Sequence, residues 1–170
     1  LPAGLEDAVE LARQQAEADE AARTKVEVLG HLADVLGDRG YELGDEFAVA
    51  ETTDVVAGVP GTDHLVRVRE RDGELLFNVV RVDADGRRDS SADAAAEETW
   101  CHDFHAARSE LQARGVGLAL RRHDSPGEHP VDVMSPAEVA AQFGVEVAQA
   151  SQDSESRTAT SQSTGRERRR

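Results

Sequence analysis

The dipeptide Asp72-Gly73 constrains the fold of this chain more than any other feature, because it lies between two segments rich in alternating apolar residues. Asp-Gly favours the two-residue turn that joins the strands of a tight β-hairpin. We therefore expect segments 65–71 and 74–82 to pair as antiparallel strands. A two-residue loop also sets the register, so Arg71 should oppose Glu74.

The predicted hairpin has two unlike faces. Because side chains alternate along a strand, one face is expected to lie on the core, and it carries Val66, Val68, Leu75, Phe77 and Val79. The other face mixes aliphatic and basic residues: Leu65, Arg67, Arg69, Arg71, Leu76, Asn78 and Val80. Arginine stems lying over scattered aliphatic side chains explain this mixture in one interpretation. In the other interpretation the face binds a partner, through Leu65, Arg67, Arg69, Leu76 and Val80.

A long helix is predicted before the hairpin, from Leu5 to Leu36, and should be closed by Gly37 and Gly40. Its first half has apolar residues at the 4-3-4 spacing of a coiled-coil seam, namely Leu5, Val9, Ala12 and Ala16. Asp19 and Arg23 interrupt that seam. The first half is therefore either the protruding end of a globular helix or the end of a coiled coil.

The remaining segments complete an α+β pattern. A second helix should begin with a capping box of Ser90 and Asp93 and run to about Arg114. Its apolar stripe should pack on the sheet, and consists of Trp100, Phe104, Ala107 and Leu111. Short strands are expected at 47–50, 54–59, 116–121 and 131–133, and a short helix at 137–143 starts at the N-cap Ser135.

These elements predict an α+β fold with a long N-terminal helix and a three- to five-stranded, mainly antiparallel sheet around the hairpin. Both long helices should pack on one face of that sheet. Three regions are expected: a protruding helix or coiled-coil end at 1–20, a small α+β domain at 21–146, and a disordered polar tail at 147–170.

The composition is strongly acidic, with 34 Asp and Glu against 19 Lys and Arg and a formal net charge of −15. This charge argues against nucleic-acid binding by the body of the chain, because phosphate binding depends on clustered basic residues. The near absence of lysine is typical of a salt-rich cytoplasm or of a GC-rich genome. The sequence has no apolar run long enough to predict a membrane span. The single cysteine suits a reducing, cytoplasmic compartment.

Cys101, His102 and His105 are the strongest candidates for chemistry, since they lie within about one turn of the second predicted helix. Thiolate and imidazole groups are natural zinc ligands. A fourth ligand would have to come from His64, Asp103, His123 or His129. The same residues also suggest a thiol enzyme, although a cysteine at such a position is commonly a small core residue. We expect no catalytic residue and no cofactor, with zinc as the alternative.

The segment Ser135–Val145 resembles the first helix and turn of a helix-turn-helix, with a small alanine in the helix and Gly-Val at the turn. That resemblance implies a DNA-reading helix in 146–157, but this stretch has three acidic residues, one arginine and several serines. The alternative is a C-terminal helix that caps the core. A basic end, residues 165–170, is the other place where nucleic acid or an acidic partner could bind.

The sequence therefore predicts an acidic, non-catalytic interaction or scaffolding module. It would bind a protein partner or itself through the first helix, the hairpin face, or both. The alternatives are a metal-dependent or thiol enzyme centred on Cys101, His102 and His105, and a nucleic-acid regulator that uses residues 135–157.

Overall fold

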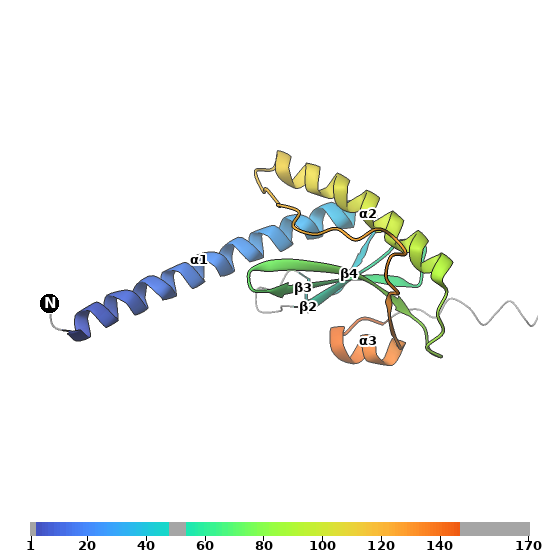
Figure 1. Cartoon of the computed structure of the whole chain (residues 1–170), viewed down its shortest axis with the longest axis horizontal. Coiled ribbons are helices and arrows are strands. Elements are labelled where there is room, and N and C mark those ends of the chain that lie inside the picture. Colours follow the sequence, from blue (N-terminus) through green and yellow to red (C-terminus); the bar gives the residue numbers. More distant parts are fainter. Residues whose placement is uncertain (1–2, 48–53, 147–170) are drawn as a thin grey trace, which may run out of the picture.

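The fold is α+β, as predicted, in a computed structural model that describes residues 3–47 and 54–146 (Figure 1). The elements, in chain order, are α1 (Ala3–Asp38), β1 (Glu42–Leu43), β2 (Asp54–Gly58), β3 (His64–Arg71), β4 (Glu74–Val82), α2 (Ser90–Ala113), β5 (Asp132–Met134) and α3 (Pro136–Phe143). The expectations for the tail at 147–170 lie outside the described residues.

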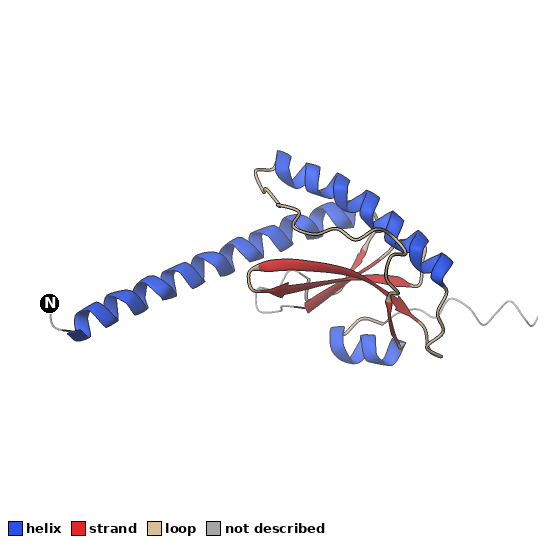
Figure 2. Ribbon diagram, in the orientation of Figure 1, coloured by secondary structure: helices blue, strands red, loops and turns tan. Residues whose placement is uncertain are grey.

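The five strands form one mixed sheet in the order β1-β2-β3-β4-β5 (Figure 2). The first four strands are antiparallel neighbours, whereas β5 pairs with β4 in parallel over Val80–Val82. The hairpin register is confirmed, with Arg71 opposite Glu74. Asp72 and Gly73 have φ values of 54° and 78°, which are the positive values that this turn requires.

Two layers of helix cover the sheet on opposite faces. The second half of α1 and the stripe of α2 lie on one face, as expected, and form the main core with the hairpin side chains Val66, Val68 and Val79. The rings of Phe77 and Trp100 lie 5.6 Å apart at the centre of this layer. The short helix α3 covers the other face and forms a second, smaller core, as Figure 1 shows below the sheet.

Each of the two long helices is followed by a glycine with a positive φ value, which lets the chain reverse direction. After α1, Gly40 has φ 84° and Tyr41 N–H donates to the carbonyl of Leu36 at 3.0 Å. After α2, Gly115 has φ 88° and Val116 N–H donates to the carbonyl of Leu111 at 2.9 Å. This is the Schellman arrangement, in which a residue in the left-handed region lets the chain turn back on the last carbonyls.

Several local predictions were wrong. Segment 116–121 is not a strand; Arg108 Nε of α2 donates a hydrogen bond to the Leu118 carbonyl at 2.8 Å and links the segment to that helix. The N-cap of α2 is Asp89 and not Ser90; its side chain accepts from the amides of Ser91 and Ala92. A short strand that was not predicted, β1, lies at Glu42–Leu43. Of the strand expected at 47–50, Phe47 lies in a turn and the rest lies outside the described residues.

The cap of α3 is confirmed. The Ser135 side chain accepts from the Glu138 amide while the Glu138 carboxylate accepts from the Ser135 amide at 2.7 Å, a complete capping box.

Candidate functional site

The first half of α1 extends away from the folded body, and we call residues 6–24 the arm (Figure 1). Every side chain in the arm is exposed. Val9 and Leu11 are the largest exposed hydrophobic side chains there, at 63% and 66% of their surface. The first side-chain hydrogen bond between α1 and the sheet is made by Lys25, whose Nζ lies 2.9 Å from the Glu70 carboxylate.

Local pairs support the arm as a helix. Arg13 contacts Glu10 at 2.8 Å and Glu17 at 3.1 Å, one turn away on either side. Such pairs each contribute only about 0.2–0.5 kcal/mol. The side chain of Leu5, the first residue of the predicted seam, lies outside the described part of the chain.

The predicted partner-binding face of the hairpin is partly closed by α3. Leu65 and Val80 are 5% and 2% exposed, and Leu65 belongs to the second core together with Val139 and Phe143. The expectation that these two residues lie on an open surface was therefore wrong. The sequence did not reveal this, because the apolar side of α3 contacts a face some sixty residues away along the chain.

The other residues of that face have partners within the chain. Arg67 pairs with Asp54 and lies over the Phe143 ring, 5.5 Å from its centroid. This partnership with Asp54 raises the pKa of Arg67 above its ordinary value. Arg69 contacts Asn78 at 3.2 Å, and Leu76 remains 38% exposed. The accessible part of the face is thus concentrated toward the hairpin turn.

Cys101, His102 and His105 lie on α2, but they do not converge as a ligand set. In the described residues, the group of three possible ligands within 4.8 Å of one another is Asp124, Glu128 and His129, all exposed. Burial, with the nearby Glu97 carboxylate, raises the pKa of the Cys101 thiol. A raised pKa opposes the thiolate form that both nucleophilic attack and metal binding need.

The other residues considered as a fourth ligand are also separated. His105 faces His123, with ring centroids 5.8 Å apart, while Asp103 accepts a hydrogen bond from the Tyr41 hydroxyl at 2.8 Å. His64 is buried on β3. His129 belongs to the exposed loop group described above.

A buried ionic group that sequence reasoning missed lies between the sheet and α2. His64 Nε2 and Arg81 Nε both lie within hydrogen-bond distance of Asp93 Oδ1, at 2.8 and 2.7 Å. All three residues are buried, and His64 Nδ1 has no partner among the described residues. The signal was present, because Asp93 falls on the same helical stripe as Ala96 and Trp100. A carboxylate on a core stripe requires a buried cationic partner.

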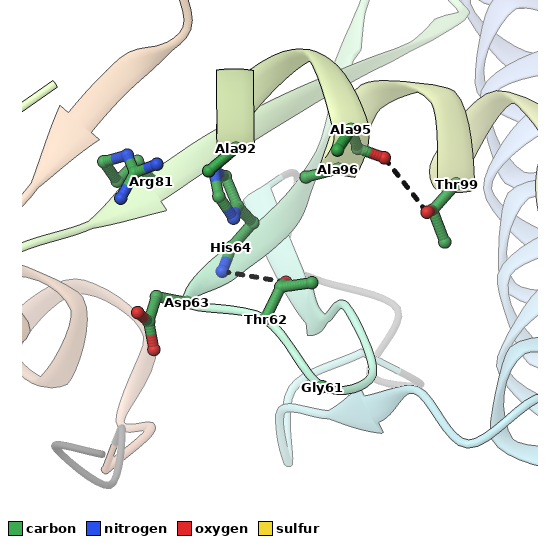
Figure 3. Close-up of a pocket in the computed structure, with 9 residues that line it drawn as sticks. All are labelled: Gly61, Thr62, Asp63, His64, Arg81, Ala92, Ala95, Ala96 and Thr99. Atoms are coloured by element: carbon green, nitrogen blue, oxygen red, sulfur yellow. Dashed lines mark hydrogen bonds between the residues drawn. The ribbon is translucent and has the colours of Figure 1, made fainter. Parts of the chain in front are cut away.

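A shallow cleft of about 290 Å³ lies beside this group, between the loop at Gly61–Asp63 and the alanine side of α2. Figure 3 shows His64 directed toward Ala92, with Arg81 beside it. The hydroxyls of Thr62 and Thr99 already donate to backbone carbonyls, of Val59 and Ala95. The pairing within this group therefore neutralises a buried charge, and His64 Nδ1 remains without a hydrogen-bond partner among the described residues.

The segment that resembles a helix-turn-helix uses its apolar side within the fold. Val139 and Phe143 of α3 are buried against the sheet, and Gly144 ends the helix with φ 65°. Most of the expected recognition helix, from residue 147 on, lies outside the described residues. The geometry of α3 is thus that of a helix capping the core.

No protein-family model, curated protein or solved structure matches this chain. The described helices include none with the length and apolar character of a membrane span.

Proposed function

We propose that this chain is an acidic, non-catalytic interaction module that binds a partner helix along the arm. One observation carries the proposal: residues 6–24 are helical and all exposed, while the same helix is anchored in the core farther along. Most helical stability in proteins comes from the packing of an amphipathic face, and the exposed arm has no such packing within the described chain. An exposed apolar side at helical spacing is the usual feature of a helix that contacts another helix.

The arm offers apolar residues on two sides. Val9, Ala12 and Ala16 form the predicted seam. On the opposite side, Leu11, Ala18 and Ala22 continue at heptad spacing into Leu29 and Leu32 of the core. The small alanines allow a close approach of another helix, which supports a coiled-coil contact.

Charge favours a basic partner over a second arm. Residues 3–24 contain six acidic side chains against two arginines, a net charge of −4. Two such arms side by side would repel at low salt, whereas a basic amphipathic helix would be attracted. The single cysteine supports placing this interaction in a reducing, cytoplasmic compartment.

The test compares the full chain with a variant that has lost the apolar side chains of the arm, Val9→Asp with Leu11→Asp. Leu120→Asp is the matched control, since Leu120 is another exposed leucine but lies outside the arm. A labelled basic amphipathic peptide, followed by fluorescence anisotropy, should bind the full chain and the control and lose affinity for the arm variant. Equal binding by all three proteins, or by none, would contradict the proposal.

Two further outcomes are informative. Light scattering of the full chain and of the arm variant across protein concentration shows whether a second copy occupies the arm, because self-association through the arm should be lost only in the variant. Metal analysis of the purified chain addresses the alternative at Cys101, His102 and His105, and stoichiometric zinc would favour that alternative.

A further inference from the structure

His64 has a buried ring nitrogen that the fold leaves unpaired. The residue is 3% exposed, yet its Nδ1 atom has no hydrogen-bond partner among the described residues. Buried polar atoms are nearly always paired with protein, water or ligand, so this atom requires an explanation. The residue also lines the cleft of about 290 Å³ between the loop at Gly61–Asp63 and α2, and Figure 3 shows it between Thr62 and Ala92. A group that enters this cleft is therefore a candidate partner for Nδ1.

The pairing of the other ring nitrogen determines what Nδ1 can bind. His64 Nε2 lies 2.8 Å from Asp93 Oδ1, and a carboxylate only accepts hydrogen bonds, so Nε2 carries the hydrogen. Arg81 donates to the same oxygen at 2.7 Å and supplies the positive charge that balances Asp93. The pairing therefore needs no charge on the imidazole, and Nδ1 of a neutral ring keeps a lone pair. The partner of Nδ1 must then be a hydrogen-bond donor.

Other side chains that line the cleft also offer acceptors. The hydroxyls of Thr62 and Thr99 donate their hydrogens to backbone carbonyls, and their oxygens remain able to accept. Asp63 adds an exposed carboxylate to the lining. Arg81 also lines the cleft, but its charge is paired within the buried ionic group. This lining favours a ligand that donates hydrogen bonds and carries a positive charge.

The α2 wall of the cleft is apolar and consists of small side chains. Ala92, Ala95 and Ala96 lie on one side of the helix, as Figure 3 shows, and leave space that longer side chains would fill. Ala96 belongs to the main core, whereas Ala95 is exposed. Such a wall suits a short hydrocarbon group, and burial of that group would add to the affinity of the hydrogen bond.

We propose that this cleft binds a small primary amine in its ammonium form. The ammonium N–H donates to His64 Nδ1, the carboxylate of Asp63 attracts the charge, and the hydrocarbon group contacts the alanine wall. The net charge of −15 on the chain favours the approach of a cation over that of an anion. The site lies in the body of the fold, so this proposal does not depend on partner binding by the arm.

Three probes with a similar branched carbon chain separate the contributions of the hydrogen bond and the charge: isobutylamine, isobutanol and isobutyrate. Each is added to the isotope-labelled full chain in mildly alkaline buffer, in which free imidazole is neutral. Isobutylamine should shift the nuclear magnetic resonance signals of His64 Nδ1 and of the loop amides at Gly61–Asp63, with a Kd on the order of 1 mM. Isobutanol should bind about tenfold more weakly, because it lacks the charge. Isobutyrate should leave these signals unchanged.

Substitution of an exposed residue tests the place of binding without altering the core. Ala95→Leu fills the cleft from the surface of α2 and should weaken isobutylamine binding at least about tenfold. Ala141→Leu is the matched control, since Ala141 is an exposed alanine of α3 on the other face of the sheet, and it should bind as the original chain does. His64→Phe keeps a ring but removes the acceptor, so it should also lose binding.

Several results would overturn the proposal. These are the absence of any shift with isobutylamine, equal binding of the three probes, binding of isobutyrate alone, and shifts confined to residues outside the cleft. Isobutylamine binding that survives in either Ala95→Leu or His64→Phe, or that weakens equally in Ala141→Leu, would overturn it as well.

Discussion

The two halves of α1 belong to one continuous helix but lie in opposite surroundings. Residues 6–24 contact solvent, with Arg13 bridging Glu10 and Glu17 as local support. In the second half, Leu29, Leu32, Val35 and Leu36 are buried in the main core. Packing therefore stabilises one half, while the other depends on its own propensity and on any partner that it binds. This difference separates the residues that maintain the fold from those available for interaction.

The largest difference in the free energy of unfolding is expected between substitutions of two carboxylates that each pair with an arginine. Asp93 pairs with Arg81 inside the body, and Glu10 pairs with Arg13 on the arm. Asp93→Ala should lower the free energy of unfolding by about 3–5 kcal/mol, because it leaves a buried guanidinium without a counter-ion. Glu10→Ala should leave the free energy of unfolding unchanged. Urea denaturation of both variants measures the contrast.

A double variant identifies the cause. If an unpaired charge is responsible, Asp93→Ala combined with Arg81→Met should recover part of the lost stability. A double variant less stable than Asp93→Ala alone would show that Arg81 contributes mainly by packing.

A leucine pair compares the two halves of α1 directly. Leu32 is fully buried, and Leu32→Ala should cost about 2–5 kcal/mol through lost burial and the cavity that remains. Leu11→Ala should change stability by less than about 0.5 kcal/mol, because Leu11 is 66% exposed. Thermal or urea unfolding distinguishes the two. A large loss for Leu11→Ala would mean that the arm is already buried against another chain.

The sequence predicted what depends on neighbouring residues. Asp72-Gly73 determines the hairpin register, and Ser135 with Glu138 determines the start of α3, because turn and cap chemistry act over a few residues. The apolar spacing in the first half of α1 was also visible in the sequence, and it led to the expectation of a protruding helix or a coiled-coil end there.

Features that depend on distant contacts were missed. Leu65 and Val80 were placed on a possible partner-binding face, but Leu65 lies in the second core under α3 and Val80 is only 2% exposed. Asp93 was assigned to a capping box, whereas its buried partners come from β3 and β4. Segment 116–121 was predicted to be a strand, but its Leu118 carbonyl accepts a hydrogen bond from Arg108 of α2. Local propensity does not determine which of two competing partners a carbonyl finds.

Stability at alkaline pH reports on the contact between Tyr41, which follows the buried half of α1, and Asp103 of α2. Burial and the hydrogen bond to Asp103 raise the pKa of the Tyr41 hydroxyl above its ordinary value. The folded state therefore keeps this proton after the unfolded chain releases it, so stability should fall as pH rises above about 10. The midpoint of Tyr41→Phe should fall less over the same range. Because Tyr41 is the single tyrosine, its ultraviolet absorbance reports its ionisation without interference from another tyrosine; ionisation near the ordinary pKa would contradict the prediction.

Salt should act in opposite directions on the arm and on the body, and this is the smallest expected effect. A net charge of −15 destabilises a compact chain through self-repulsion, which salt screens, so the thermal midpoint should rise by a few degrees between low salt and molar KCl. The same screening weakens the exposed pairs of Arg13, so helix content in the arm should not rise with the midpoint. Circular dichroism follows the midpoint, and amide exchange in residues 6–24 follows the arm. A flat or falling midpoint would count against an adaptation to a salt-rich cytoplasm, and an arm that gains protection in salt would indicate association of two arms once their repulsion is screened.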